Sequence, residues 1–156
     1  MAIAIGQKAP DFNLHNTDKN KVALSDYSGK NLVVLFFPLA FTGVCTNELC
    51  AMRDSMAIYN ELNTEVIGIS VDSLFVLEKF KKENDLNFEL LSDFNKETAK
   101  AYGCLYDSFA FDMTGVAKRS AFVIDKEGVV QYAEVLESAG DLPDFDAIKA
   151  SLQKLN

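Results

Sequence analysis

The sequence contains no tryptophan and is poor in histidine and cysteine. Its single histidine, His15, lies in a polar turn far from any cysteine in the sequence, and the cysteines number only three, Cys45, Cys50 and Cys104. A cysteine hydrolase needs an imidazole base beside its nucleophile. A zinc site uses four ligands at short paired spacings, which these residues do not offer. Both classes are therefore disfavoured, and we expect no metal and no cofactor.

Long hydrophobic runs and clusters of positive charge are also absent. The longest apolar run covers residues 32–37, whereas a membrane span takes about 20 residues. The net charge is −8 over 156 residues, without a basic stripe of the kind that binds nucleic acid. No glycine-rich phosphate loop is present, and so few cysteines argue against a disulfide framework. We expect a cytoplasmic protein that binds neither membrane nor nucleic acid.

The apolar periodicity predicts one domain over residues 1–156 in which strands and helices alternate. The run NLVVLFF at 31–37 is apolar on both faces, which is typical of a buried central strand. Leu49, Met52, Met56 and Tyr59 recur at helical spacing on one face. We expect an N-terminal hairpin (12–14, 22–24), strands (31–37, 65–71, 88–91), helices (46–62, 73–84, 95–102), a hairpin (119–124, 129–136) and a helix (143–155) with Pro143 near its first turn. This order indicates a mixed α/β sheet with helices on both faces, a thioredoxin-like fold.

Cys45 follows the predicted central strand and stands at the first turn of the next helix. Ligands of open α/β sheets bind beyond the carboxyl ends of the strands. Free backbone N–H groups at a helix start favour a thiolate, the reactive form of cysteine. A packed core thiol is the competing interpretation. A Cys-x-x-Cys dithiol is excluded because Glu48 occupies the second cysteine's place; its carboxylate is interpreted as part of a solvated helix face.

The segment PLAFTGVC at 38–45 matches the P-x-x-x-T-x-x-C motif and resembles peroxiredoxins. APDFNL near the N-terminus, LLSDF at 90–94, AYG at 101–103 and KRSAFVID at 118–125 resemble further segments of that family in the expected order. FFPLAFTGVC is most similar to the alkyl hydroperoxide reductase E branch. The Cys-x4-Cys spacing is similar to the bacterioferritin comigratory protein branch, or Q type.

The resemblance implies a thiol-dependent reduction of hydrogen peroxide and organic hydroperoxides. Cys45 would attack the peroxide and become a sulfenic acid, while the Thr42 hydroxyl would hydrogen-bond the thiolate and the peroxide. Pro38 would shield the thiolate from water, and Arg119 would approach it from a neighbouring strand. Hydrogen-bond donors aimed at the departing oxygen lower the barrier to peroxide cleavage. The guanidinium of arginine is always charged and holds its N–H donors in a rigid plane.

Cys50 raises a geometric question about resolution of the sulfenic acid. Five residues along a regular helix separate Cα atoms by about 8.7 Å, whereas disulfides need about 4.4–6.8 Å. If Cys50 resolves Cys45, the first turns must therefore unwind. In the alternative, a one-cysteine peroxidase, an external thiol reduces Cys45 and Cys50 is a bystander.

Two further expectations concern partners. The reductant would be thioredoxin or a low-molecular-weight thiol. The aromatic segment 105–117 is typical of a binding loop or interface, and similar peroxiredoxins pair through such loops, so we expect a homodimer. Cys104 is expected to pack or to lie in a loop, and an intersubunit or intramolecular resolving role is the less favoured alternative. A thiol–disulfide carrier or redox-regulated binding protein on the same fold is the rival to a peroxidase.

Overall fold

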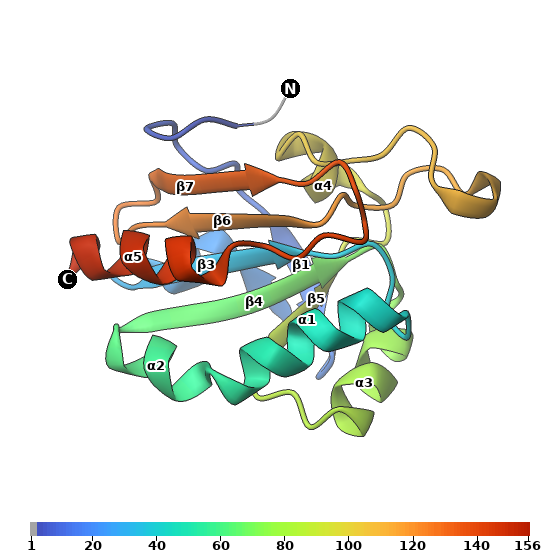
Figure 1. The fold of residues 1–156 in the computed structure, drawn as a ribbon, viewed down its shortest axis with the longest axis horizontal. Coiled ribbons are helices and arrows are strands. Elements are labelled where there is room, and N and C mark those ends of the chain that lie inside the picture. Colours follow the sequence, from blue (N-terminus) through green and yellow to red (C-terminus); the bar gives the residue numbers. More distant parts are fainter. Residues whose placement is uncertain (1–2) are drawn as a thin grey trace.

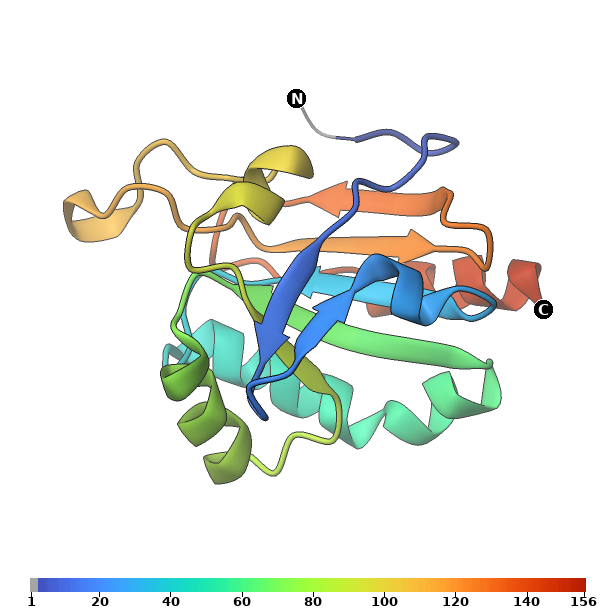
Figure 2. The same cartoon turned by 180° about the vertical axis from the view of Figure 1, so that it is seen from behind.

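The computed structural model describes residues 3–156, which form a seven-stranded mixed sheet with helices on both faces (Figures 1 and 2). The strand order is β2-β1-β5-β4-β3-β6-β7. The strands are β1 (Asn13–Asn16), β2 (Lys21–Ala23), β3 (Asn31–Phe36), β4 (Thr64–Ser70), β5 (Glu89–Ser92), β6 (Ser120–Ile124) and β7 (Val130–Val135). The helices are α1 (Gly43–Asp54), α2 (Met56–Glu61), α3 (Leu74–Glu83), α4 (Glu97–Ala101) and α5 (Phe145–Leu155), with the 3-10 turns η1 (Leu24–Tyr27) and η2 (Ala110–Asp112). The expected mixed sheet and N-terminal hairpin are confirmed.

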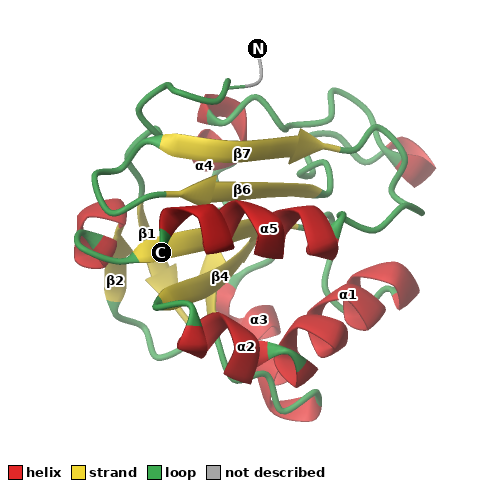
Figure 3. Cartoon of the chain, turned by 60° about the vertical axis from the view of Figure 1, so that its left-hand side comes forward, coloured by secondary structure: helices red, strands yellow, loops and turns green. Residues whose placement is uncertain are grey.

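Strand β3 lies at the centre of the molecule, parallel to β4 and antiparallel to β6. All of its residues are buried, because successive side chains enter two different cores. Val33 and Leu35 pack on the side covered by α1, α2, α3 and α5, which Figure 3 shows in front of the sheet. Val34 and Phe36 pack on the side where α4 and the N-terminal segment lie (Figure 2). The double burial expected from the run NLVVLFF is confirmed.

The expected helix over residues 46–62 differs from the structure at its start and in its middle. Helix α1 begins at Gly43, because Thr42 has an extended backbone and takes the N-cap position. The helical hydrogen bonding is interrupted at Ser55, whose φ of −101° and ψ of 2° lie outside the helical region, and α2 starts directly after it. The earlier start places Cys45 inside the first turn, as its third residue.

Two further boundaries correct the sequence interpretation. Pro143 precedes the last helix instead of joining its first turn, because Asp144 caps α5 by accepting a hydrogen bond from the Ala147 N–H at 3.0 Å. Arg119 stands just before β6, which begins at Ser120. In contrast, the helix expected over residues 73–84 starts within one residue of its expected position, because Ser73 is the N-cap of α3 and its hydroxyl accepts from the Val76 N–H at 3.2 Å.

Within residues 3–156, no helix is both long and apolar enough to cross a membrane. The segment 105–117 projects from the body of the protein past the ends of strands β6 and β7 and carries η2 (Figure 1). Its tip presents Phe111, which is 93% exposed and has a φ of 59°. An L residue adopts such a left-handed backbone conformation at a cost, so the tip holds an aromatic side chain in water at an unfavourable backbone geometry.

Candidate active site

The site is built around Cys45, which the chain places at the start of α1. Strand β3 ends at Phe36, a short loop follows, and the helix begins at Gly43. The first four N–H groups of a helix have no partner within it, and the Cys45 N–H is one of them. The cysteine is 1% exposed. The helix start therefore directs backbone dipoles that favour negative charge toward a sheltered sulfur atom.

Arg119 reaches this sulfur from the neighbouring strand. Ser120 of β6 lies opposite Phe36 of β3 in the antiparallel register, so the preceding arginine arrives beside the loop that leads to α1. Its Nη2 donates to Cys45 Sγ at 3.2 Å. The same guanidinium donates to the Ala139 carbonyl, from Nη2 at 3.0 Å and from Nε at 3.3 Å. An arginine with 1% of its surface exposed is thus fixed in position by its acceptors.

Glu48 completes this arrangement, and the sequence interpretation did not predict it. Its Oε1 accepts from Arg119 Nη1 at 2.5 Å, and its side chain is fully buried instead of solvated. Residues three positions apart share one face of a helix, so the spacing of Glu48 from Cys45 was the signal available in the sequence. The carboxylate orients the guanidinium whose other arm contacts the sulfur.

Burial and charge pairing act in opposite directions on the pKa values of Glu48 and Arg119. Burial raises the pKa of Glu48 to about 7, although Arg119 acts to lower it. Burial alone would lower the pKa of Arg119, but the charges of Glu48 and Cys45 and their hydrogen bonds outweigh it and raise that pKa. The guanidinium therefore stays positive. Glu48 Oε2 is buried without a hydrogen-bond partner among the described residues, so the pair is only partly satisfied.

Thr42 and Pro38 lie on the loop that covers the cysteine. The Thr42 hydroxyl donates to the Leu39 carbonyl at 2.7 Å, so its proton is directed into the loop in this conformation. Pro38 is buried directly after the central strand. Both residues line the same small cavity as Cys45 and Arg119, which has a volume of about 270 Å³.

The walls of this cavity also come from two loops far away in the sequence. Phe109 enters from segment 105–117, which was expected to contribute to a binding site or interface. Ala139 and Gly140 enter from the loop between β7 and α5, and no sequence motif indicated them. The cavity has space for a small substrate beside the sulfur.

The other two cysteines occupy different surroundings. Cys50 is half-buried on α1, and its thiol donates to Asn84 Oδ1 at 3.6 Å. Cys104 is fully buried in the core on the opposite face of the sheet from Cys45. Burial raises the pKa of the Cys104 thiol to about 12. Packing was one of the expected placements of Cys104, and its position separates it from the site.

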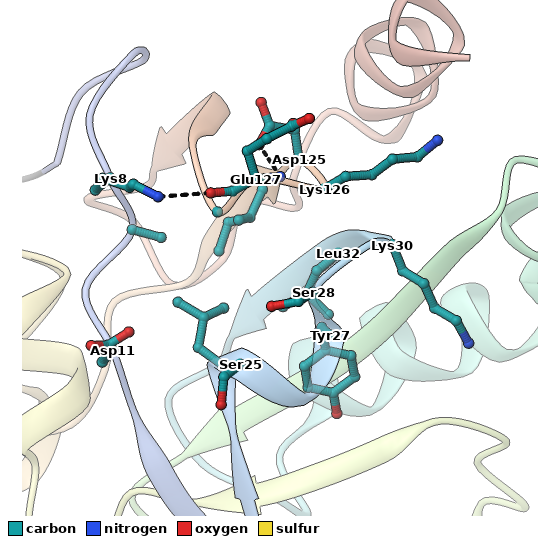
Figure 4. Close-up of a pocket in the computed structure, with 14 residues that line it drawn as sticks. Lys8, Asp11, Ser25, Tyr27, Ser28, Lys30, Leu32, Asp125, Lys126 and Glu127 are labelled. Carbon is teal, nitrogen blue, oxygen red and sulfur yellow. Dashed lines mark hydrogen bonds between the residues drawn. The ribbon is translucent and has the colours of Figure 1, made fainter.

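A second hollow, of about 280 Å³, lies at the other end of β3 (Figure 4). Lys8, Tyr27, Lys30 and Asp125 are among its lining residues, and Lys8 Nζ donates to the Glu127 carbonyl at 2.8 Å. No cysteine lines it. Because ligands of such sheets bind at the carboxyl ends of the parallel strands, the cavity at Cys45 is the candidate active site.

Comparison with known proteins relates this geometry to a family. The model described as the AhpC/TSA family matches residues 5–133. The peroxiredoxin Bcp of Bacillus subtilis is 43% identical over 130 residues, which cover 82% of this chain and 82% of that protein. The chloroplastic 2-Cys peroxiredoxin BAS1 of Spinacia oleracea is 42% identical over 142 residues, 84% of this chain, and the match spans about half, 52%, of that relative's length.

Solved structures agree with the sequence relatives. Peroxidoxin BcpB from Mycobacterium tuberculosis superposes with a TM-score of 0.87 at 27% identity, covering 99% of each chain. A peroxiredoxin-like protein from Aquifex aeolicus reaches a TM-score of 0.90 at 24% identity, covering 100% of this chain and 90% of that one. The resemblance to peroxiredoxins and the thioredoxin-like fold are confirmed.

Proposed function

This chain belongs to the AhpC/TSA family, and from that membership and the geometry at Cys45 we propose that it is a thiol-dependent peroxidase. The observation that carries the proposal is the donation from Arg119 Nη2 to Cys45 Sγ at 3.2 Å, beside a cavity at the carboxyl end of the central strand. Its substrates are hydrogen peroxide and organic hydroperoxides. The small cavity has Pro38, Leu39, Val44 and Phe109 in its walls, which favours peroxides with a short apolar group.

The first step is a displacement at oxygen. The Cys45 thiolate attacks the terminal oxygen of the peroxide, the S–O bond forms, and the O–O bond breaks. The departing hydroxide or alkoxide takes up a proton and leaves as water or an alcohol, and Cys45 becomes a sulfenic acid. Negative charge moves from sulfur to the departing oxygen, so donors already in place at both atoms lower the barrier.

Each residue of the motif has a part in this step. The Arg119 guanidinium and the free backbone N–H of Cys45 stabilise the charge on sulfur and oxygen. The Thr42 hydroxyl turns from the Leu39 carbonyl toward the peroxide when substrate enters, a rotation about one side-chain bond. Pro38 has no N–H and covers the sulfur with apolar atoms, which keeps water away from the thiolate.

We propose that Cys50 resolves the sulfenic acid and that thioredoxin or a similar small thiol reduces the resulting disulfide. The two cysteines stand five residues apart on α1. In a regular helix their Cα atoms would be about 8.7 Å apart, whereas a disulfide allows a Cα–Cα distance of at most about 6.8 Å. The first turn must therefore open, and helix ends open at low free-energy cost. Three free thiols fit a reducing compartment such as the cytoplasm.

We further propose that two copies of the chain pair beside the active site. Phe41 is 50% exposed and Phe111 is 93% exposed, and both belong to loops that border the cavity region. Exposed aromatic side chains in loops next to a site are typical of interfaces. Sedimentation analysis at micromolar concentration tests this, and a monomer throughout would contradict it.

The experiment for the activity is a peroxide-dependent NADPH oxidation assay with thioredoxin and its reductase. Cys45→Ser should abolish turnover, whereas Cys104→Ser should retain it because that thiol is buried on the other face. Cys50→Ser should stop recycling by thioredoxin but leave one rapid reduction of peroxide per chain. If Cys45→Ser kept turnover, the proposal would fail. If Cys50→Ser kept full turnover, the one-cysteine alternative would replace the resolving role.

A further inference from the structure

The two halves of α1 are attached to the rest of the protein by different partners. In the first half, Cys45 and Glu48 both contact one side chain, Arg119. The N-cap residue Thr42 makes no side-chain capping hydrogen bond. When Cys45 becomes a sulfenic acid, the contact between its sulfur and Arg119 changes. The first half therefore depends on an attachment that the reaction itself alters.

The second half of α1 is attached to the end of α3. The Arg53 Nη1 donates to the Asn84 carbonyl at 2.6 Å, and Asn87 Nδ2 donates to the Arg53 carbonyl at 3.3 Å. Leu49 and Met52 are buried in the same core as β3. Neither of these two hydrogen bonds involves Cys45 or Arg119, so oxidation of Cys45 does not alter them directly.

Asn84 has a second contact that bears on Cys50. Its Nδ2 donates to the Phe80 carbonyl at 3.0 Å and closes the end of α3. That leaves Oδ1 free to accept from the Cys50 thiol at 3.6 Å. The Asn84 amide therefore contacts both the end of α3, through Nδ2, and the Cys50 thiol, through Oδ1.

The contact with Asn84 points the Cys50 thiol away from Cys45. Five residues turn a helix through about 500°, so the two side chains leave the axis about 140° apart. The Cys50 sulfur faces the end of α3, while Cys45 faces Arg119. Unwinding the first turn brings Cys45 closer, but the Cys50 thiol must still leave Asn84 before it reacts.

We propose that Asn84 is a positioning residue that latches the Cys50 thiol in the folded enzyme, so that its release limits formation of the Cys45–Cys50 disulfide. This inference rests on the proposed resolving role of Cys50. In the step itself, Cys50 loses its proton and its sulfur attacks the sulfenic sulfur of Cys45. The S–S bond forms, the S–O bond of the sulfenic acid breaks, and hydroxide leaves as water with that proton. Cys50 is oxidised and the sulfenic sulfur is reduced.

The latch has a consequence at high peroxide concentration. A sulfenic acid that waits for Cys50 is exposed to a second peroxide molecule, which oxidises it to a sulfinic acid. Resolution and overoxidation therefore compete for the same intermediate. A slower release of Cys50 increases the sulfinic fraction.

The test is a single turnover with one equivalent of hydrogen peroxide, quenched in acid, alkylated and followed by mass spectrometry. Asn84→Ala removes the acceptor of the Cys50 thiol and should speed conversion of sulfenic acid to disulfide by about 2- to 10-fold, the range of one hydrogen bond. Asn84→Asp is the matched control. It also loses the Nδ2 bond to the Phe80 carbonyl but keeps an oxygen acceptor for the thiol, so it should not speed the conversion.

A second control variant, Arg53→Gln, shows whether loosening α1 from the end of α3 is enough by itself to change the rate of conversion. Arg53→Gln leaves the Asn84 side-chain amide and the helix cap intact and removes only the guanidinium contact to the Asn84 carbonyl, so it should not speed the conversion. In all three variants the first reaction, loss of the Cys45 thiol, should keep its wild-type rate constant. The sulfinic fraction at excess peroxide should fall in Asn84→Ala in proportion to the faster resolution and should stay at the wild-type level in Asn84→Asp and Arg53→Gln.

The outcomes separate the latch from the resolving role. If the wild-type protein forms the disulfide but Asn84→Ala and Asn84→Asp convert at the same rate, the latch is refuted and resolution by Cys50 stands. If the wild-type protein forms no Cys45–Cys50 disulfide, the resolving role fails and the latch with it. If Asn84→Ala changed the rate constant for loss of the Cys45 thiol and the rate constant for disulfide formation by the same factor, Asn84 would only support the fold, and the latch would be refuted.

Discussion

Replacing Arg119 with glutamine should affect stability and catalysis through separate contacts. The guanidinium is the only counter-charge that contacts the Glu48 carboxylate among the described residues, and both side chains are buried. Removing one partner of a buried ion pair costs about 3–5 kcal/mol. For a chain of this length that corresponds to a melting temperature about 6–20 °C lower.

The loss of stability should depend on pH in a defined direction. Burial raises the pKa of Glu48 to about 7 even with Arg119 present, and without Arg119 the pKa rises further. A carboxyl group whose pKa is raised on folding contributes its full stability below its unfolded pKa, and the contribution is lost as the pH rises through the folded value. As the pH falls toward 5, a growing share of Glu48 is protonated in both proteins, so the difference in stability should fall toward about 1–2 kcal/mol of lost hydrogen bonds. At pH 8 it should reach the full 3–5 kcal/mol.

The rate of reaction with peroxide should fall in the Arg119 variants whether or not their stability is restored. Loss of one donor at a developing charge costs about 10²- to 10³-fold in rate, and Arg119 donates directly to Cys45 Sγ. The double variant Arg119→Gln/Glu48→Gln removes both charges. It should recover at least half of the stability lost at pH 8, because no unpaired carboxylate remains, but none of the activity.

Urea denaturation at pH 5 and pH 8, together with stopped-flow consumption of hydrogen peroxide, measures both quantities. Lys118→Gln is a matched control, since it removes a neighbouring cation whose ion pair with Glu137 is exposed. That control should change stability by less than about 1 kcal/mol. An equal loss for Arg119→Gln at the two pH values would refute the role assigned to Glu48. The role would also be refuted if the double variant Arg119→Gln/Glu48→Gln were as unstable at pH 8 as Arg119→Gln alone.

Three further predictions follow from single contacts. Thr42→Val removes the hydroxyl that donates to the Leu39 carbonyl and should lower the rate constant with peroxide by about 10- to 100-fold. Thr42→Ser should retain most of that rate constant in the same stopped-flow assay. Gly68→Ala would place a methyl group 2.8 Å from Leu90 Cδ2 and should lower the free energy of unfolding by about 1–3 kcal/mol in urea titration. Cys104 should resist iodoacetamide at pH 8 in the native protein, because burial raises its pKa to about 12, and labelling visible by mass spectrometry as fast as that of Cys50 would contradict this.

The fold was predictable to the extent that it depends on apolar periodicity. The run at 32–37 has apolar residues at every position, and a strand covered on both faces buries them all. The break at Ser55 was not predictable, because the apolar spacing continues from α1 into α2 without a change of phase. Pro143 was misplaced because proline is common both just inside and just before a helix start.

The site was predictable where its residues share a local motif. Pro38, Thr42 and Cys45 lie within one loop and the helix start, so their proximity follows from the chain itself. Glu48 was misread because its helical position is compatible with either water or the core. Ala139 contributes a backbone carbonyl, and any residue type would supply one, so the sequence carries no signal for it.

The sequence by itself determined that a cysteine would stand at the start of a helix beyond a buried strand, because these features depend on local propensity and periodicity. The resemblance to peroxiredoxins also pointed to Arg119, but only the tertiary structure decided how the distant residues meet that cysteine. The antiparallel register of β6 against β3 brings Arg119 to the sulfur, and the packing of α1 turns Glu48 inward to meet it. The packing of α1 against the end of α3 likewise directs Cys50 to Asn84. Such contacts join residues 34 to 74 positions apart, and they form only when the whole sheet has folded.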